Sequence, residues 1–460
     1  MGCYKCNNIE ISEYGTSGDS VFRDINPMDI NMPPGYQLEI LMAGLDSPIG
    51  MAFSELGDLY IAEAGINTGI AKIIRVNKGQ VEIIAQNFSV PISGISYLDG
   101  TIYVSHKGFI TTLKPDGSRQ DIIAGLPCNG DNSISNVTIG ADDKIYFGLG
   151  TATNSGVVGT DNPWVFNHPF LCDYPAADII LNGQNFISDN MLNMAVDNIY
   201  TGAFAPYGVQ NTPYEVRKGF VKASGSILRA NRDGTELELV AWGLRNPVHV
   251  MFDESFRLFA ANRGYDVRGS RPIANAPDEF QLIRTGIWYG WPDYSAGEPV
   301  TLPKFKPEGR SQPEFLLASH PNQPPMPFTR FPPHSSVIGF DFNYNQSFGF
   351  YGDVFIAEYG SYGPSTMGAS AAYAGVNHRV SRINMQTGEV VTFISNKSGL
   401  PANIRGEGGL GRPVDVKFGP DHAMYILDYG ISDSLDPRRI ISETGVLWRV
   451  SRTGDGVRQT

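Results

Sequence analysis

The sequence predicts an all-β protein, and within that class a six-bladed β-propeller. Glycine (52) and proline (31) are abundant, charged residues make up only 18% and aromatic residues 11% of the 460 residues. This composition is typical of turn-rich, well-packed β proteins. Propellers commonly use a chain of this length as one domain. The strongest indication is a strand–turn–strand unit that recurs six times.

Each repeated unit has a short apolar strand, a turn of acidic or glycine residues, and a second strand that ends near a glycine. Apolar and polar positions alternate within each unit, which indicates strands and not helices. Recurrence at a coarse period indicates a radial array. The six copies begin at Pro48, Pro91, Ile134, Asn246, Ser336 and Arg412.

A second hairpin follows most copies, and its tip carries a turn glycine such as Gly117 or Gly234. The sixth copy instead ends with the single strand Gly445–Arg452. At the other end of the chain, Tyr36–Leu45 is a β-type run without a partner. We expect these two strands to pair, because this closes the last blade and removes exposed edges.

Residues 1–33 are polar, lack a period and are expected to form an N-terminal arm, and residues 34–460 are expected to form a single propeller. Three segments exceed what a blade needs. Residues 151–222 fall inside the third blade, 265–277 lie within the fourth, and 298–334 are expected to link the fourth blade to the fifth. Insertions of this size usually cover or form a site, so we expect them on the active face.

The charge pattern limits the partners. Net charge is −12 and no run of lysine or arginine is visible, so a nucleic acid is not expected. No apolar run approaches the ~20 residues that span a bilayer and no cleavable signal is recognisable, so we expect a soluble chain without a membrane span. A small, neutral, polar ligand fits this composition better.

Four cysteines are too few for a disulfide scaffold. Cys3 and Cys6 form a lone CxxC, which is interpreted as an incidental or labile pair. Cys128 and Cys172 lie in expected loops and are either bridged or free.

Polar residues gather at one face of the expected ring. The start of the first strand and the end of the second strand of each blade lie on the same face of a propeller. The second strands end at Glu63, His106, Leu149, Asn262, Glu358 and Asp428. Five of these six are polar, which fits either a merely solvated funnel or a funnel that binds an oxygen-rich ligand or a cofactor with several carboxylates.

Several motifs give the chain a resemblance. The segments GLRNP (243–247), DEFQLI (278–283), YGWP (289–292), GRPVDV (411–416) and GPD (419–421) resemble the glucose/sorbosone dehydrogenase family over about residues 34–452. Members of this family are six-bladed propellers that use pyrroloquinoline quinone (PQQ) and calcium. The resemblance implies oxidation of a sugar or of a sugar-derived alcohol or aldehyde. It also implies an extracytoplasmic or secreted location, and it leaves the electron acceptor open.

The resemblance also implies residue roles. Arg245 and Asn246 would contact cofactor or substrate, and Arg412 would pair with a quinone carboxylate, for which a guanidinium fork is suited. The calcium ion, which prefers oxygen ligands, would be held by the carbonyls of a loop that acidic residues support. The residues of that calcium loop are Gly264, Tyr265, Asp278 and Glu279. The alternative interpretation is that Asp278 and Glu279 are turn residues that cap an outer strand.

The sequence departs from the family at the proton acceptor. Sugar-oxidising members have an Asp-His pair before the inner strand of the third blade, and the histidine is the base. Here the matching pair is Asp131-Asn132, and an amide cannot accept that proton. Ser89, Val376 and Val414 likewise stand where the family has glutamine, lysine and arginine. Altered chemistry is therefore expected.

Three histidines are candidates to replace the missing base. We expect His249 to project from the first strand of the fourth blade into the channel, and His106 and His334 to lie on the active face. Together with the acidic strand ends they could form a transition-metal site or an acid–base pair. The alternative is that each is a structural histidine with satisfied hydrogen bonds.

Three functions remain open at this stage. The first is a sugar dehydrogenase with calcium and with or without the quinone. The second is a metal-dependent lyase or lactonase that uses funnel histidines and acids. The third is a non-catalytic carbohydrate-binding propeller, because the fold alone does not choose among them.

Overall fold

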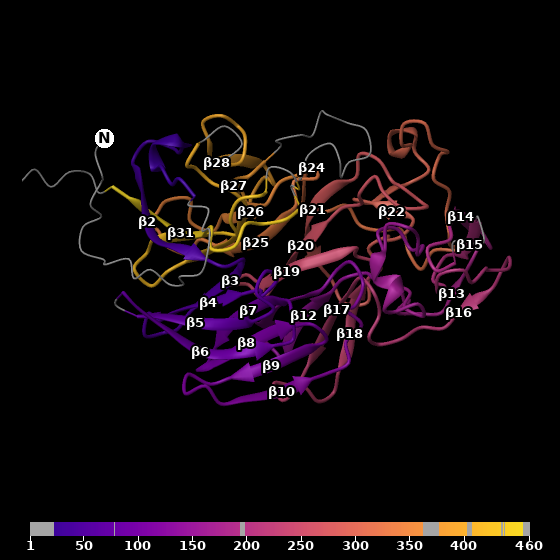
Figure 1. Cartoon of the computed structure of the whole chain (residues 1–460), viewed down its shortest axis with the longest axis horizontal. Helices are drawn as coiled ribbons and strands as arrows, with labels where there is room; N and C mark the ends of the chain where they lie inside the picture. The colour runs from indigo at the N-terminus through magenta and orange to yellow at the C-terminus, as the bar shows by residue number, and fades with distance from the viewer. Residues whose placement is uncertain are drawn as a thin grey trace, which may run out of the picture.

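The computed structural model describes residues 23–77, 79–193, 198–361, 377–402, 407–433, 436 and 438–453. Its main sheets are arranged around a common centre as a six-bladed β-propeller (Figure 1). The fold class predicted from the repeats is confirmed. Cys3, Cys6, Lys78 and Val376 lie outside the described residues.

The first three blades follow the predicted repeats. Blade 1 contains β3 (Pro48–Phe53), β4 (Leu59–Glu63), β5 (Ala71–Asn77) and β6 (Gln80–Phe88). Blade 2 contains β7 (Ile92–Leu98), β8 (Thr101–His106), β9 (Phe109–Leu113) and β10 (Arg119–Ile123). Blade 3 contains β11 (Ile134–Ile139), β12 (Ile145–Leu149), β17 (Ser226–Ala230) and β18 (Glu238–Trp242).

The last three blades complete the ring. Blade 4 contains β19 (Asn246–Phe252), β20 (Leu258–Arg263), β21 (Pro277–Ile283) and β24 (Thr329–Pro333). Blade 5 contains β25 (Val337–Phe342), β26 (Val354–Glu358), β27 (Arg379–Ile383) and β28 (Val390–Asn396). Blade 6 contains β29 (Pro413–Phe418), β30 (Met424–Asp428), β31 (Gly445–Arg452) and β2 (Tyr36–Leu45).

The predicted closure of the ring is confirmed. β2 pairs antiparallel with β31 from Tyr36↔Arg452 to Leu45↔Gly445. The pair places Ile40 opposite Trp448, whose side chain is fully buried. An apolar outer strand at the start of the chain therefore covers an apolar strand at its end.

The segment before β2 contacts the ring as well. η1 (Pro27–Asp29) leads into β1 (Ile30–Asn31), which pairs with β28 of blade 5. The guanidinium of Arg23 forms a 2.7 Å ion pair with buried Asp428. Part of the expected arm is thus attached to the propeller.

One boundary expected from the sequence is wrong. Residues 298–334 were expected to link blades 4 and 5, but β24 lies within this segment and is the outer strand of blade 4. The strand reads TRFPP, and proline cannot donate to a ladder, so it is tolerated only at an edge. Because the prolines hide the alternation, this strand resembles a loop in the sequence.

The insertions form a layer of their own beside the blades, on the right of Figure 1. It contains three two-stranded sheets, which are β13 (Ile179–Ile180) with β16 (Val216–Arg217), β14 (Asn185–Asp189) with β15 (Asn198–Gly202), and β22 (Tyr294–Ser295) with β23 (Glu298–Pro299). An apolar cluster that includes Trp288 and Trp291 lies beneath them. The short helices η2 (Pro163–Phe166) and η3 (Pro303–Phe305) also belong here.

Among the described residues the helices are short 3-10 turns, and none could span a bilayer. Cys128 and Cys172 are buried and free, which settles the alternative left open by the sequence.

Buried polar side chains join the inner strands of neighbouring blades around the channel. Asn136 of blade 3 exchanges two hydrogen bonds with the backbone of Val250 in blade 4. Asp415 of blade 6 accepts a 2.9 Å hydrogen bond from the backbone N–H of Met51 in blade 1. These bonds satisfy inner-strand groups that have no further strand to pair with.

Candidate functional site

The polar ends of the second strands bind the backbone of their own blades. Asp428 accepts 2.7 Å hydrogen bonds from the N–H groups of Gly411 and Arg412. Asn262 accepts from the N–H groups of Arg245 and Asn246 at 3.1 and 3.0 Å. Each therefore fixes the loop that leads into the inner strand.

Glu63 and Glu358 act similarly within blades 1 and 5. Glu63 accepts a 3.0 Å hydrogen bond from the N–H of Asp46 and forms a 2.9 Å ion pair with Lys72. Glu358 binds Arg379 and the hydroxyl of Ser381. The polarity of these positions is accounted for by hydrogen bonds inside the blades.

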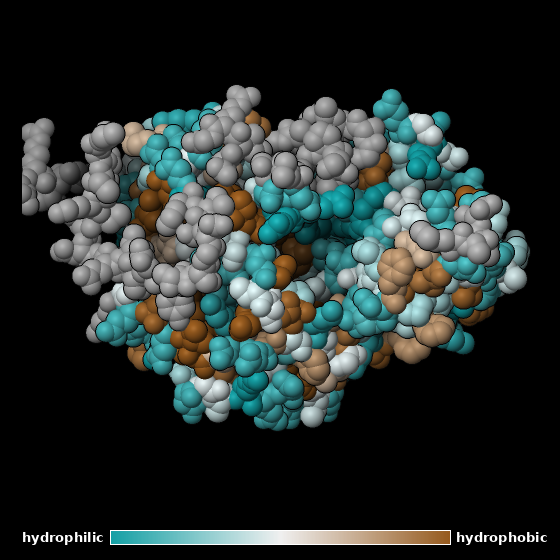
Figure 2. Space-filling model, in the orientation of Figure 1, coloured by the Kyte–Doolittle hydropathy of each residue, from teal (hydrophilic) through white to brown (hydrophobic). Residues whose placement is uncertain are grey.

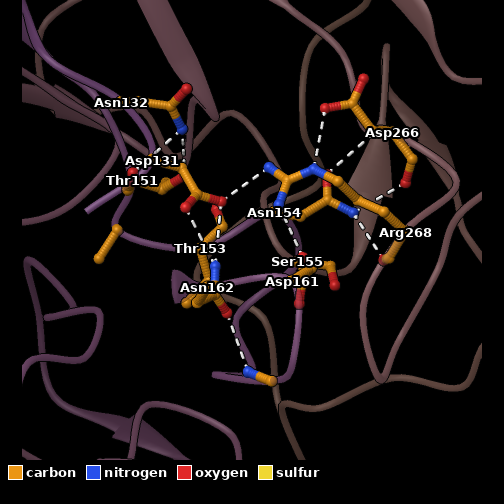
Figure 3. A network of polar contacts seen from close by, with 12 residues as sticks. Asp131, Asn132, Thr151, Thr153, Asn154, Ser155, Asp161, Asn162, Asp266 and Arg268 are labelled. Atoms are coloured by element: carbon orange, nitrogen blue, oxygen red, sulfur yellow. Dashed lines mark hydrogen bonds and ion pairs between the residues drawn. The ribbon is translucent and has the colours of Figure 1, made fainter. Parts of the chain in front are cut away.

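Asp131 and Asn132 hold the first insertion on blade 3 (Figure 3). The carboxylate of Asp131 accepts hydrogen bonds from Asn162 at 3.0 Å and Trp164 at 2.8 Å. The amide of Asn132 donates to the carbonyl and hydroxyl oxygens of Thr151 at 3.0 and 3.1 Å. Both side chains thus anchor the loop above them.

A charged network continues from Asp131 into the second insertion (Figure 3). Arg268 binds Asp131 at 2.7 Å, Asp161 at 2.6 Å and Asp266 at 3.3 Å. Asp266 also binds Arg245 at 2.9 Å. The three aspartates come from three separate loops, so a single guanidinium ties these loops together.

His334 completes this network from the loop before blade 5. Its Nδ1 lies 3.5 Å from Oδ1 of Asp266. His334 has a φ of 63°, a left-handed conformation that is costly for a residue other than glycine and that is found disproportionately at functional sites. Of the three candidate histidines, His334 is the one that the structure pairs with a carboxylate.

The ionisation of Asp266 follows from its neighbours. Burial by itself would raise the pKa of Asp266, but the charge of Arg245, the hydrogen bond with His334 and the charge of Arg268 outweigh burial and hold the pKa well below its usual range. About a third of the side chain remains exposed, at 36%. Asp266 is therefore an ionised carboxylate beside an imidazole.

The other two histidines lie elsewhere. His106 packs between Phe88 and Phe109 and shares a 2.7 Å hydrogen bond with Thr111 inside blade 2, and burial lowers its pKa to about 4. His249 does project into the channel, where its Nε2 lies 3.3 Å from the ammonium group of Lys417. Burial and that charge lower the pKa of His249 well below its usual value. The three histidines do not converge on one site.

The two arginines to which the resemblance gives a cofactor-binding role form hydrogen bonds with other residues of this protein. Arg245 is buried and, besides Asp266, donates to the carbonyl of Asn154 at 3.2 Å. Arg412 donates to the hydroxyl of Ser432 at 2.8 Å and the carbonyl of Ser361 at 3.1 Å. Asn246 is buried at the start of β19.

The four residues expected around calcium lie together at the end of β20 and the start of β21. Asp278 accepts hydrogen bonds from the N–H groups of Gly264 at 2.7 Å and Val337 at 3.2 Å. Glu279 accepts from the amides of Asn262 and Gln281 and from the N–H of Ala296. The hydroxyl of Tyr265 donates to the carbonyl of Tyr294 at 2.9 Å.

These bonds bear on which groups could hold a cation. Both carboxylates accept hydrogen bonds from backbone and amide donors and so support the loop. Backbone carbonyls such as those of Gly264 and Tyr265 are oxygen ligands of the kind that calcium prefers. In the described part of the chain, no three His, Cys, Asp or Glu side chains are grouped to hold a metal ion.

A pocket of about 300 Å³ lies at the mouth of the channel, and we call it the funnel pocket. Its walls come from blades 1, 4, 5 and 6. The lining residues are Ser47, Ile49, Ile66, Asn67, Arg263, Ile338, Tyr359, Tyr429, Arg438, Arg439 and Ile440. Figure 2 shows hydrophilic residues around a hollow between the ring and the insertion layer.

Arg263 lines the funnel pocket and also lies near the charged network. Its guanidinium group forms no ion pair or hydrogen bond with another described residue. Burial raises the pKa of Asp278, while the N–H of Gly264 and the charges of Arg263 and His334 oppose this rise. Arg263 and His334 are therefore both close enough to Asp278 to affect its ionisation, which places the pocket and the histidine in one region.

Sequence reasoning missed Asp161, Asp266 and Arg268, as well as the arginines of the funnel pocket. The run 263–271, RGYDVRGSR, carries four charges in nine residues inside a chain of low charge, and this density was the available signal. The pairing of its members with Asp131 and His334 depends on loops that are far apart in sequence.

No family model and no curated protein matches the chain. Solved structures do match it. The holo form of the pyranose dehydrogenase PQQ domain from Coprinopsis cinerea is 13% identical with a TM-score of 0.58, covering 92% of this chain and 97% of that one. The calcium structure of a Trichoderma reesei protein of Carbohydrate-Active Enzymes Family AA12 is 13% identical with a TM-score of 0.56, covering 95% and 99%.

The PQQ-bound aldose sugar dehydrogenase from Streptomyces coelicolor is 16% identical with a TM-score of 0.50, covering 92% of this chain and all of that one. The class of protein is thus a six-bladed propeller with a pocket lined by isoleucine, tyrosine and arginine at the channel mouth. Within that class, the similar structures from Coprinopsis cinerea and Streptomyces coelicolor are a pyranose dehydrogenase domain and an aldose sugar dehydrogenase, and at these identities the similarity establishes the fold alone.

Proposed function

We propose that this protein is an oxidoreductase that oxidises a hydroxyl or aldehyde carbon of a sugar-like molecule at the funnel pocket. The observation that carries this proposal is the pairing of His334 with ionised Asp266 next to a pocket lined by arginine and tyrosine. Similarity to an aldose sugar dehydrogenase and a pyranose dehydrogenase domain along more than nine-tenths of the chain supports it.

His334 would act as the proton acceptor in place of the histidine that is missing at Asn132. In this role Nδ1 faces Asp266, and Nε2 would take the proton of the substrate hydroxyl. The ionised carboxylate orients the ring and stabilises the positive charge that forms on it, as in other His–Asp pairs. Arg245 and Arg268 are positioning residues, because they hold Asp266 in place.

The funnel pocket fits a planar cofactor with several carboxylates. Arg263, Arg438 and Arg439 offer three guanidinium groups, and Tyr359 and Tyr429 offer aromatic faces. When bound there, PQQ would supply the two-electron acceptor for the substrate. These residues differ from Arg245 and Arg412, the pair that the resemblance assigns. Calcium would be bound through the carbonyls of Gly264 and Tyr265.

The test is reconstitution of the full chain with PQQ and calcium, followed by dye reduction on a panel of aldoses. We expect cofactor binding by absorbance titration and sugar-dependent reduction. The His334→Asn variant should lose about 10²- to 10⁴-fold in kcat while PQQ titrates as in the parent.

The matched control is His422→Asn, an exposed turn histidine that also has a positive φ, and it should behave like the parent. Absence of both cofactor binding and dye reduction in the parent would refute the proposal. Sugar binding without turnover would instead identify a carbohydrate-binding propeller.

A further inference from the structure

The three insertions, which are far apart in the sequence, build one groove of about 680 Å³. One wall is the hairpin β14–β15, and the others are segments of the second and third insertions. The lining residues are Thr160, Gln184, Asn185, Phe186, Ile187, Ser188, Asp189, Asn198, Gly269, Ser270, Arg271, Pro272, Arg310, Ser311, Gln312, Pro313 and Glu314. We call it the insertion groove.

We propose that the insertion groove binds the further units of a neutral oligosaccharide whose terminal unit is oxidised at the funnel pocket. This inference rests on the proposed function, since it names the substrate class of the same enzyme. Nothing in the propeller ring requires such a groove, because none of the residues that line it belongs to a blade strand.

The groove is preformed. The guanidinium of Arg271 is buried beneath it and binds the carbonyls of Ser155, Pro292 and Glu314 and the carboxylate of Asp293, at 2.8 to 3.2 Å. Across the groove, the amide of Gln184 donates to Glu314 at 2.6 Å. The walls are thus tied to one another by hydrogen bonds before any ligand arrives, which lowers the entropic cost of binding.

The walls are continuous in sequence and space with the charged network. Thr160 immediately precedes Asp161, and Gly269 immediately follows Arg268, and these two side chains form the 2.6 Å ion pair shown in Figure 3. The same guanidinium reaches Asp266, the partner of His334. The groove therefore borders the charged network that holds Asp266, the partner of the proposed proton acceptor.

The chemistry of the lining favours neutral hydroxyl-rich ligands. Most polar members are amides and hydroxyls, which both donate and accept hydrogen bonds as sugar hydroxyls do. The charged members are Asp189, Glu314, Arg271 and Arg310, and the two signs balance. Half-buried Phe186 and 53%-exposed Ile187 offer apolar surface for the C–H face of a sugar ring. A polyanion would find no excess of positive charge here.

The experiment compares binding of malto- and cello-oligosaccharides of one to six units to the full chain by calorimetry. Affinity should rise at least about tenfold from the monosaccharide to the tetrasaccharide of one series and then level off. The Ser311→Trp variant, which fills the groove from an exposed position, should abolish this rise and leave monosaccharide binding unchanged. The control is Ser319→Trp, an exposed serine outside the lining, which should retain the rise.

Equal affinity for short and long members of both series would refute the proposal that the groove binds oligosaccharides. So would a length dependence that Ser311→Trp leaves intact. The readout is binding and not turnover, so failure of the proposed oxidation would appear separately as absent dye reduction. Arg310→Ala provides a second variant, with the exposed Lys306→Ala as its control, and should weaken tetrasaccharide binding alone.

Discussion

At the scale of single residues, the surroundings decide which carboxylates ionise. Asp266 lies between Arg245 and Arg268, and its pKa is held below the usual range. Asp173 instead accepts hydrogen bonds from the N–H of Ala152 at 2.6 Å and the hydroxyl of Thr153 at 2.5 Å. Burial raises its pKa to about 6. Two aspartates in neighbouring loops therefore have opposite shifts.

The shift at Asp173 predicts a pH dependence of stability. Its pKa is raised on folding, so between about pH 4 and 6 the folded state retains a proton that the unfolded state releases. Stability from this group is therefore greatest at low pH and is lost as pH rises through this window, by up to ~3 kcal/mol. Asp173→Asn should flatten the slope, as measured by denaturant unfolding from pH 4 to 7.

Asp233→Asn is the control, because this aspartate is an exposed turn residue with a lowered pKa. Between pH 4 and 6, the free energy of unfolding of this variant should change with pH as steeply as that of the parent protein. An unchanged slope in Asp173→Asn would contradict the assignment of the proton to this residue.

At the scale of elements, the pairing of β2 with β31 holds the ring closed. Gln37 and Ser451 are cross-strand partners 414 residues apart, and their side chains hydrogen-bond at 3.0 Å. Every other blade is continuous in the chain, whereas this one depends on bringing the two ends together. The conformational entropy of closing that loop opposes folding.

A disulfide across the closure should therefore stabilise the protein strongly. We predict that oxidised Gln37→Cys/Ser451→Cys gains about 2–4 kcal/mol over its reduced form, measured by denaturant unfolding with Cys3 and Cys6 replaced by serine. The matched pair Arg75→Cys/Glu82→Cys joins partners only 7 residues apart in β5 and β6 and should gain much less. Equal stabilisation by the two disulfides would argue against ring closure as a large entropic cost of folding.

At the scale of the whole molecule, one arginine holds separate segments of the insertion layer together. Arg271 is 3% exposed and pairs with Asp293, which is fully buried and also binds His320. Burial lowers the pKa of Arg271, while Asp293 opposes this effect. Removing such a cation leaves a buried carboxylate without its main counter-charge.

Arg271→Met should consequently cost about 3–5 kcal/mol and loosen the insertion layer before the ring. Hydrogen exchange should increase first in β14, β15 and the segment 310–317, while β2 and β31 stay protected. Arg257→Met removes a 52%-exposed side chain from its pair with Asp253 and should cost little. Simultaneous loss of protection in ring and insertions would show that the two layers unfold as one unit.

The repeats determined much of this architecture by themselves. Alternating strands at Pro48, Pro91, Ile134, Asn246, Ser336 and Arg412 predicted six inner hairpins, and the two unpaired terminal strands predicted the closure. These features are local in sequence, since strand periodicity and turn glycines act within a few residues. β24 was not predicted, because its two prolines remove the alternation by which an edge strand is recognised.

The site depended on tertiary structure. The histidine at position 334 was visible in the sequence, but its carboxylate partner Asp266 is 68 positions away in another insertion, and only the packing of the two loops brings them within 3.5 Å. The same packing uses Asp131 and Arg245 as anchors and combines three insertions into one groove. The sequence by itself therefore determined the ring, because its pattern is periodic, whereas the folded chain decided the chemistry, because side chains from distant loops share no pattern until they meet.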